Sequence, residues 1–172
     1  VRFRSRPHME KISFETSDGV TIAGNYWPGD IETLLLLHMM PATKKSWNNF
    51  ATQLSAKGWS VLAIDLRGHG ESTQNGRLDY TQFNDSEHQL SIRDVQAAAQ
   101  WLRLKNCELK GILGASIGAN LALQYQVQEG FYGKTVLLSP GFDYYGIQTR
   151  PLAETLQDPQ AIFYVGAAKD IR

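Results

Sequence analysis

Five short runs of consecutive apolar residues, separated by stretches with helical spacing, constrain the fold of this chain more than any other feature. The runs are TLLLLH at 33–38, SVLAID at 60–65, LKGILG at 109–114, TVLLS at 135–139 and AIFYV at 161–165. Because their apolar residues are continuous and do not alternate with polar ones, each run is predicted to be a strand buried on both faces. Such strands are typical of parallel sheets with helices on both sides.

The segments between these runs are predicted to form helices. In SEHQLSIRDVQAAAQWLRLKN, four apolar residues recur at three- and four-residue steps on one face: Ile92, Val95, Ala99 and Leu102. The segment SWNNFATQLSAKG has similar spacing, with Ser46 as a candidate N-cap and Gly58 as a C-terminal stop. A third helix is predicted to start at Ser116 and to end before Gly130.

The stretch KISFETSDGVTIAGNYW has a different pattern, with two alternating runs on either side of Ser17, Asp18 and Gly19. This arrangement predicts a β-hairpin at the start of the chain. The whole chain is therefore predicted to be α/β, with a mostly parallel sheet and helices on both faces. Its 172 residues contain no internal repeat and no linker rich in Pro, Gly or Ser, so residues 1–172 are expected to form a single domain.

Charge, cysteine and histidine content argue against several classes of function. Lysine plus arginine and aspartate plus glutamate number 17 each and are spread along the chain, which argues against nucleic acid as a partner. The single cysteine, Cys107, excludes an internal disulfide and favours a reducing compartment such as the cytoplasm. The four histidines lack metal-ligand spacing, and no apolar run is long enough to span a membrane.

The segment GILGASIGANLAL places Ser116 between Gly114 and Gly118, directly after a predicted strand and at the start of a predicted helix. Loops at the carboxyl ends of parallel strands form the ligand crevice of such sheets. A serine on this tight turn takes a strained backbone conformation, and the glycines two residues before and after it avoid a collision between side chains. Although chance Gly-x-Ser-x-Gly matches are common, this context predicts a nucleophile.

Three stretches, in this order, resemble the α/β-hydrolase superfamily. LLLLHMMPATKKSW resembles the strand and loop that supply part of the oxyanion hole, and VLAIDLRGHGES resembles the Asp-x-Arg-Gly-x-Gly-x-Ser loop. GILGASIGANLAL resembles the nucleophile elbow, and the detailed pattern is similar to small serine esterases of the monoglyceride-lipase and aminopeptidase-like branch. The resemblance implies a serine hydrolase that cleaves carboxylic esters of small molecules without a cofactor or a metal.

The resemblance also implies roles for individual residues. The backbone N–H groups of Met40 and Ile117 would form the oxyanion hole, although Met39 stands where relatives usually have a glycine. His38 is interpreted as a support for its loop, as in relatives. Asp65 and Arg67 of DLRGHGES are likewise interpreted as structural. His69 is at the carboxyl edge of the predicted sheet and could approach a substrate, but Gly68 and Gly70 on either side indicate that it belongs to a tight loop.

A serine nucleophile needs a histidine base and a carboxylate that orients it. Asp143 and Asp170 each follow a late strand, and Asp170 is preferred because the acid of most relatives follows the later one. In this fold the histidine comes after the acid, so the catalytic histidine, with the strand before it and the helix after it, is expected beyond Arg172. The last strand of the sheet is then expected to have an unpaired edge that favours self-association.

The stretch 140–160, where many relatives insert a helical cap, is short and implies a minimal cap over an open, shallow site. The elbow specifies acyl transfer but not the leaving group. A peptidase or thioesterase with the same machinery therefore stays open, as does a non-catalytic ligand-binding member of the fold.

Overall fold

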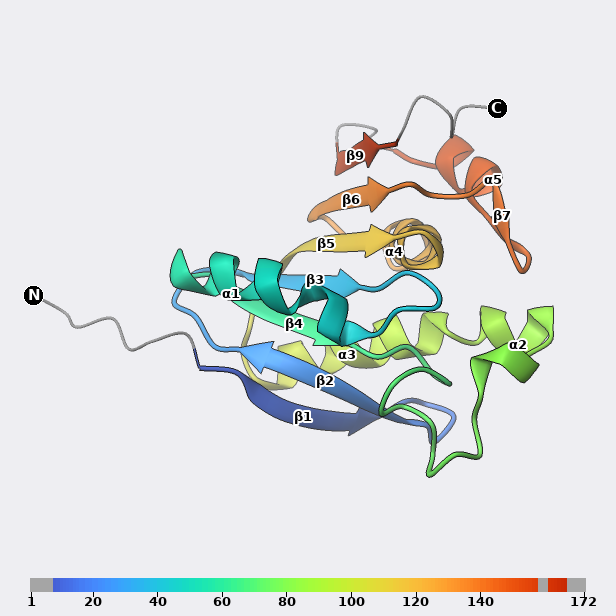
Figure 1. Ribbon diagram of the computed structural model, residues 1–172. Helices are drawn as coiled ribbons and strands as arrows, with labels where there is room; N and C mark the ends of the chain where they lie inside the picture. The colour runs from blue at the N-terminus through green and yellow to red at the C-terminus, as the bar shows by residue number, and fades with distance from the viewer. Residues whose placement is uncertain (1–7, 158–160, 167–172) are drawn as a thin grey trace, which may run out of the picture.

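A seven-stranded sheet runs through the centre of the computed structural model, which describes residues 8–157 and 161–166 (Figure 1). The strands lie in the order β1-β2-β4-β3-β5-β6-β9, and β7 and β8 form a separate pair. The strands are β1 (Glu10–Glu15), β2 (Thr21–Trp27), β3 (Thr33–Leu37), β4 (Ser60–Ile64), β5 (Leu109–Ala115), β6 (Lys134–Leu138), β7 (Asp143–Tyr144), β8 (Ile147–Gln148) and β9 (Ile162–Val165).

All five continuous apolar runs form strands of the central sheet, as predicted. The pairs β3–β4, β3–β5, β5–β6 and β6–β9 are parallel, whereas β1–β2 and β2–β4 are antiparallel. The predicted N-terminal hairpin is therefore confirmed as β1 and β2, with Gly19 at a φ of 78° in its turn. The sheet is mostly parallel, and the carboxyl ends of β3, β5 and β6 meet at one edge (Figure 1).

Helices cover both faces of this sheet. The α-helices are α1 (Asn48–Ala56), α2 (Asp85–Gln89), α3 (Ile92–Leu104), α4 (Ile117–Gln128) and α5 (Thr149–Glu154), and the 3₁₀ helices are η1 (Lys44–Trp47) and η2 (Tyr80–Gln82). Helix α1 packs on one face, and α3 and α4 pack on the other (Figure 1). Leu36 of β3 faces the α1 side, while Leu35 and Leu37 join the core beneath α3 and α4, which explains the continuous apolar run.

Two local predictions need correction. Thr43, not Ser46, caps the segment before α1, because its side chain accepts a hydrogen bond from Lys45 N–H while Ser46 lies within η1. The stretch predicted as one helix is divided into α2 and α3. The stop at Gly58 is confirmed, since this residue follows α1 with a φ of 97°.

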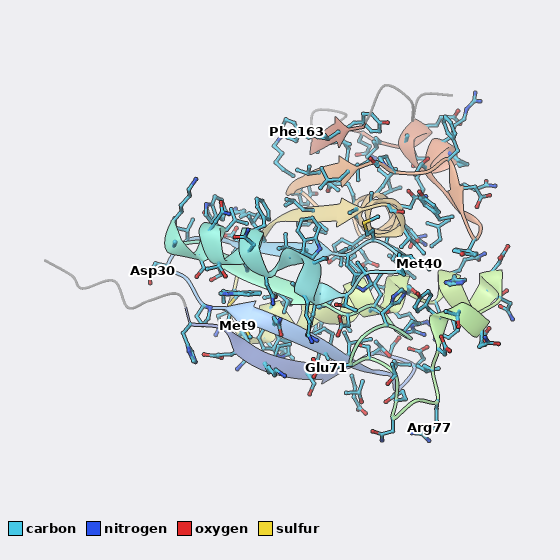
Figure 2. All side chains as sticks on the ribbon, in the orientation of Figure 1. Met9, Asp30, Met40, Glu71, Arg77 and Phe163 are labelled. Carbon is cyan, nitrogen blue, oxygen red and sulfur yellow. The ribbon has the colours of Figure 1, made fainter. Side chains whose placement is uncertain are left out.

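The stretch 140–160 contributes the β7–β8 hairpin and the short helix α5 near one end of the sheet (Figure 1). Strand β9 is the last strand in the sheet order, and among the described residues nothing pairs with its outer edge. Its side chains Phe163, Tyr164 and Val165 are each more than half exposed, and Phe163 is labelled at this edge in Figure 2. Self-association through this edge stays a prediction. Within the described part of the chain, no helix is both long and apolar enough to cross a membrane.

Candidate active site

Ser116 occupies the junction between β5, which ends at Ala115, and α4, which begins at Ile117. Its φ of 54° and ψ of −120° lie outside the helical and extended regions, which is the strained conformation expected at such a turn. Two hydrogen bonds support this conformation: Ser116 N–H donates to Leu138 O at 2.9 Å, and Ser116 O accepts from Ala119 N–H at 2.9 Å. The side chain is partly exposed at the carboxyl edge of the sheet.

The two glycines around Ser116 are required for different reasons. A Cβ atom on Gly114 would overlap the backbone of Gly118, which is the collision predicted from the sequence. A Cβ atom on Gly118 would instead lie 2.6 Å from Leu37 O and 2.7 Å from His38 O. Gly118 therefore allows the first turn of α4 to pack against the end of β3, and this contact brings the elbow next to the loop that carries Met40.

The two predicted oxyanion donors lie on these neighbouring segments. Met40 is in the loop after β3, and Ile117 is the first residue of α4. Among the described residues, neither backbone N–H has a hydrogen-bond partner. The side chain of Met39 is 47 % exposed, so the residue that replaces the usual glycine points toward solvent and not into the core. That the two N–H groups converge near the Ser116 hydroxyl stays a prediction.

His38 is buried and both of its ring nitrogens are engaged. Nε2 accepts a hydrogen bond from Leu66 N–H at 3.0 Å, and Nδ1 lies 2.9 Å from Met39 O, to which it donates. Burial lowers the pKa of His38, which keeps the ring neutral. The bond from Leu66 joins the loop after β3 to the loop after β4, which is the supporting role predicted for this residue.

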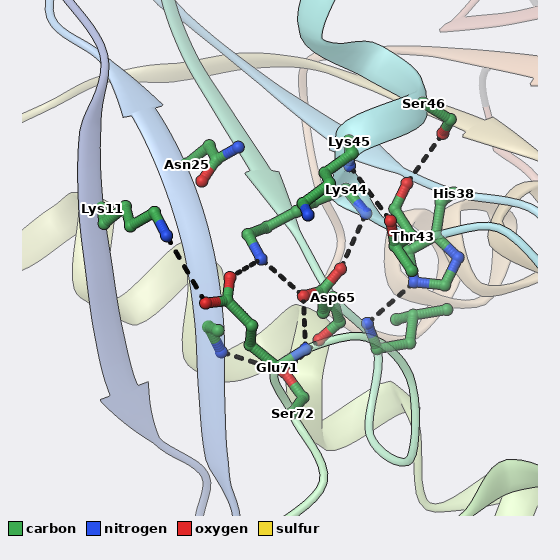
Figure 3. Close-up of polar contacts among 12 residues, drawn as sticks. Lys11, Asn25, His38, Thr43, Lys44, Lys45, Ser46, Asp65, Glu71 and Ser72 are labelled. Atoms are coloured by element: carbon green, nitrogen blue, oxygen red, sulfur yellow. Dashed lines mark hydrogen bonds and ion pairs between the residues drawn. The ribbon is translucent and has the colours of Figure 1, made fainter.

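A buried ion cluster fixes the same two loops from the other side (Figure 3). Lys44 Nζ contacts Asp65 Oδ2 at 2.6 Å and also binds Glu71, and Lys44 N–H donates to Asp65 Oδ1 at 2.7 Å. Burial disfavours the charged form of Lys44, but the hydrogen bonds that its ammonium group donates to Asp65 and Glu71 outweigh this effect and raise the pKa of Lys44. Asp65 also accepts from Glu71 N–H at 2.9 Å, so its structural role is supported.

Arg67 forms a second buried cluster, which ties the β4 loop to α3 and to the first hairpin. Its Nε donates to Asp94 Oδ1 at 2.9 Å, and its two terminal nitrogens bind Asp18 at 2.8 and 3.0 Å. The Arg67 hydrogen bond is the main reason that the pKa of Asp18 lies well below its usual range. The sequence predicts Asp18 only as a turn residue. Its ion pair with Arg67 could not be predicted from local sequence, because the two residues are 49 positions apart.

Asn120 is a site residue that the sequence reasoning missed. It lies one helical turn after Ser116 and is buried. Its Nδ2 donates to Gly141 O at 3.0 Å and to Ile147 O at 2.8 Å, and its Oδ1 accepts from Gly141 N–H at 3.1 Å. The β7–β8 hairpin is thereby fixed to the helix that follows Ser116. Within GILGASIGANLAL the only signal is that Asn120 is polar while the residues beside it in the first turns of the helix are apolar.

The two candidate acids differ in what the structure describes. Within the described part of the chain, the side-chain hydrogen bonds of Asp143 lie in the β7–β8 hairpin, where it accepts from Gly146 N–H at 2.6 Å and from Gln148 Nε2 at 3.1 Å. Asp170 lies outside the described residues. Among the described residues, no group of three His, Cys, Asp or Glu side chains gathers in a way that would hold a metal ion.

Comparison with protein families identifies the chain. Residues 31–162 match the family described as serine aminopeptidase, S33. The chain belongs to this family. An esterase of Pyrococcus furiosus is similar in structure, with a TM-score of 0.74 and 19 % identity over 92 % of this chain and 70 % of that one. At this identity the likeness shows the fold, and together with the family match it confirms the predicted α/β-hydrolase fold.

Curated relatives of this serine aminopeptidase family member include hydrolases from distant organisms. The AB hydrolase superfamily protein YisY of Bacillus subtilis is 29 % identical over 64 % of this chain and 42 % of its own length. A serine hydrolase-like protein of Dictyostelium discoideum is 27 % identical over 66 % of this chain and 30 % of its own length. The chain thus spans less than half the length of these relatives. The comparisons support a hydrolase and leave its bond specificity open.

Proposed function

We propose that this chain supplies the nucleophile of a serine hydrolase that cleaves carboxylic esters. The observation that carries the proposal is the conformation of Ser116, with a φ of 54° on a strand-to-helix turn and a side chain free of local capping bonds. A turn that holds a serine in this costly conformation favours a functional role, because strained residues cluster at active sites. The family match and the esterase-like fold support the same reaction class.

In the proposed reaction, Ser116 Oγ attacks the carbonyl carbon of the ester and its proton passes to a histidine base. The N–H groups of Met40 and Ile117 donate to the oxyanion that develops on the carbonyl oxygen. The alcohol leaves with the proton, and water then hydrolyses the acyl-enzyme and releases the acid. Because serine has a poorly nucleophilic hydroxyl at neutral pH, the base is essential to this sequence of steps.

The base is proposed to be a histidine outside these 172 residues, oriented by Asp170. Two observations favour this assignment over His38 and His69. Both ring nitrogens of His38 are engaged, and the His69 ring stacks on Tyr80 with 3.9 Å between centroids. Equal ester hydrolysis by the isolated 172-residue chain and by the full-length protein would contradict the assignment.

The test is covalent labelling by a fluorophosphonate probe combined with hydrolysis of p-nitrophenyl butyrate by the full-length protein. Ser116→Ala is expected to abolish labelling and to lower kcat by about 10⁶-fold, the usual effect of removing such a nucleophile. Ser13→Ala, at an exposed position on β1, serves as the matched control and is expected to leave both unchanged. Labelling that persists in Ser116→Ala would refute the proposal, and a wild-type protein that neither labels nor hydrolyses esters would favour a binding function.

Peptide hydrolysis is the second candidate function, because the matching family is described as serine aminopeptidase, S33. Peptide hydrolysis needs the same nucleophile and oxyanion donors, because both reactions pass through a tetrahedral intermediate and an acyl-enzyme. An aminoacyl-p-nitroanilide assay separates the two candidates.

A further inference from the structure

The turn of the β7–β8 hairpin carries one side chain back to the candidate oxyanion loop. Tyr145 lies at this turn, and its hydroxyl donates to Met40 Sδ at 3.8 Å, although the two residues are 105 positions apart. Met40 is labelled in Figure 2 on the side of the sheet where the β7–β8 hairpin and α2 lie. The Tyr145 side chain therefore stands beside the segment proposed to bind the oxyanion.

The ring of Tyr145 is held on its other side by α2. It stacks on His88 with 3.8 Å between ring centroids and 19° between planes, and Phe83 packs edge-on against the same histidine. The backbone is fixed as well, because Gln89 Nε2 donates to Tyr145 O at 2.8 Å. His88 is buried, whereas Tyr145 is 40 % exposed, so part of the tyrosine remains available for contact with a ligand.

The position of the ring is built into the backbone. Tyr145 has a φ of 54°, a left-handed conformation that is uncommon for a bulky residue. The adjacent Gly146 N–H bonds to Asp143 in the same hairpin, and Asn120 holds both ends of the segment through Gly141 and Ile147. Such strain persists only where surrounding contacts enforce it, and it often accompanies a functional position.

Met40, His88 and Tyr145 form a wall beside the candidate site. The groups that this wall exposes are a thioether and an aromatic ring, which are largely apolar and polarizable. Thioether and aromatic groups contact hydrocarbon favourably and give no charged partner to a polar acyl group. Met39, next to Met40, is 47 % exposed and extends the same character. A rigid aromatic side chain beside an oxyanion loop limits the space for the group attached to the reacting carbonyl.

We propose that Tyr145 is a specificity-determining residue whose ring restricts the site to esters with short, apolar acyl groups. The inference rests on the proposed function, because it places the reacting carbonyl beside Ser116 and Met40. It also assigns a function to the β7–β8 hairpin, which would shape the site in place of the larger cap that many relatives insert between these strands. The ring determines selectivity, and the weak hydroxyl contact to sulfur contributes little.

The experiment measures kcat/KM of the full-length protein for p-nitrophenyl acetate, butyrate and octanoate. Tyr145→Gly removes the ring and relieves the left-handed backbone, so this variant is expected to fold. It should raise the octanoate-to-acetate ratio of kcat/KM by about tenfold or more, the scale at which a pocket discriminates hydrocarbon groups. Tyr145→Phe keeps the ring and should leave the ratio within about twofold of wild type. Tyr132→Gly, at a fully exposed tyrosine, is the matched control and should leave it unchanged.

An unchanged ratio in an active Tyr145→Gly variant would overturn the inference while leaving the proposed function intact. A shift of equal size in Tyr145→Phe would also overturn it, because selectivity would then depend on the hydroxyl and not on the ring. If the wild-type protein neither reacts with the fluorophosphonate probe nor hydrolyses any of the esters, the proposed function is overturned, and this inference with it. If Tyr145→Gly has a lower melting temperature than wild type, the same ratio of kcat/KM is measured in Tyr145→Asn. This variant also lacks the aromatic ring, and asparagine tolerates positive φ.

Discussion

Replacing Lys44 with methionine is expected to lower the free energy of unfolding by about 3 kcal/mol, the low end of the cost of breaking a buried ion pair. The Lys44 side chain is 2 % exposed and that of Asp65 is fully buried, with 2.6 Å between Nζ and Oδ2. Without the ammonium group, the Asp65 carboxylate keeps two backbone donors, Lys44 N–H and Glu71 N–H. These bonds retain part of the stabilisation, which places the expected loss at the low end.

Chemical denaturation by urea measures this loss, and thermal unfolding should show a decrease in melting temperature of about 6–12 °C for a domain of this size. Glu71→Gln is the matched control, because Glu71 contacts the same ammonium group but its side chain is 50 % exposed. That change should cost less than about 1 kcal/mol. A loss in Lys44→Met no larger than that in Glu71→Gln would refute the argument that burial gives this cluster its strength.

Two further predictions concern acid sensitivity and the packing of the elbow. Burial, reinforced by the neighbouring His38, lowers the pKa of His69 to about 4. Between about pH 6.5 and 4, His69 is therefore protonated in the unfolded chain but neutral in the folded chain. The stabilisation is complete above pH 6.5 and is lost as the pH falls through that window, by up to about 3 kcal/mol. Comparing urea unfolding at pH 7.5 and 5 should therefore show a smaller acid loss in His69→Phe than in wild type, and equal losses would disprove it. Gly118→Ala should lower stability by about 2 kcal/mol or more and should reduce fluorophosphonate labelling, since the new methyl group meets the carbonyl oxygens of Leu37 and His38. Wild-type melting temperature and labelling in that variant would contradict the close approach of α4 to β3.

The sheet and the elbow could be predicted because their causes lie in short stretches of sequence. A strand buried on both faces needs consecutive apolar residues, and β3 and β4 alternate between two cores in this way. The elbow needs glycines at fixed offsets from the serine, and steric exclusion at Gly114 and Gly118 confirms that need. The capping error at Thr43 and the division between α2 and α3 arise where several polar residues offer equivalent local bonds.

The ion clusters beneath the site could not be predicted in the same way. Lys44 stands in a polar loop sequence, where an exposed side chain is the ordinary expectation for lysine. Its burial depends on Asp65, 21 positions away, and on the close packing of two loops that the sheet brings together. Arg67 was interpreted as structural from the family resemblance, but its partners Asp18 and Asp94 come from elements on either side of it in the chain.

The wall beside the candidate site depends on contacts at still longer range. Tyr145 pairs with Gln89 across 56 positions and with Met40 across 105, and no local pattern in FDYYG distinguishes this tyrosine from its neighbour Tyr144. Asn120 links a predicted element to one that was not predicted. It belongs to the helix predicted after Ser116, and it holds both ends of the β7–β8 hairpin through Gly141 and Ile147. The helix that begins beside Ser116 therefore positions the proposed nucleophile through its first residues and the proposed selectivity wall through the next turn. If the two proposals hold, a change in the hairpin is expected to alter ester selectivity without disturbing the backbone that holds Ser116.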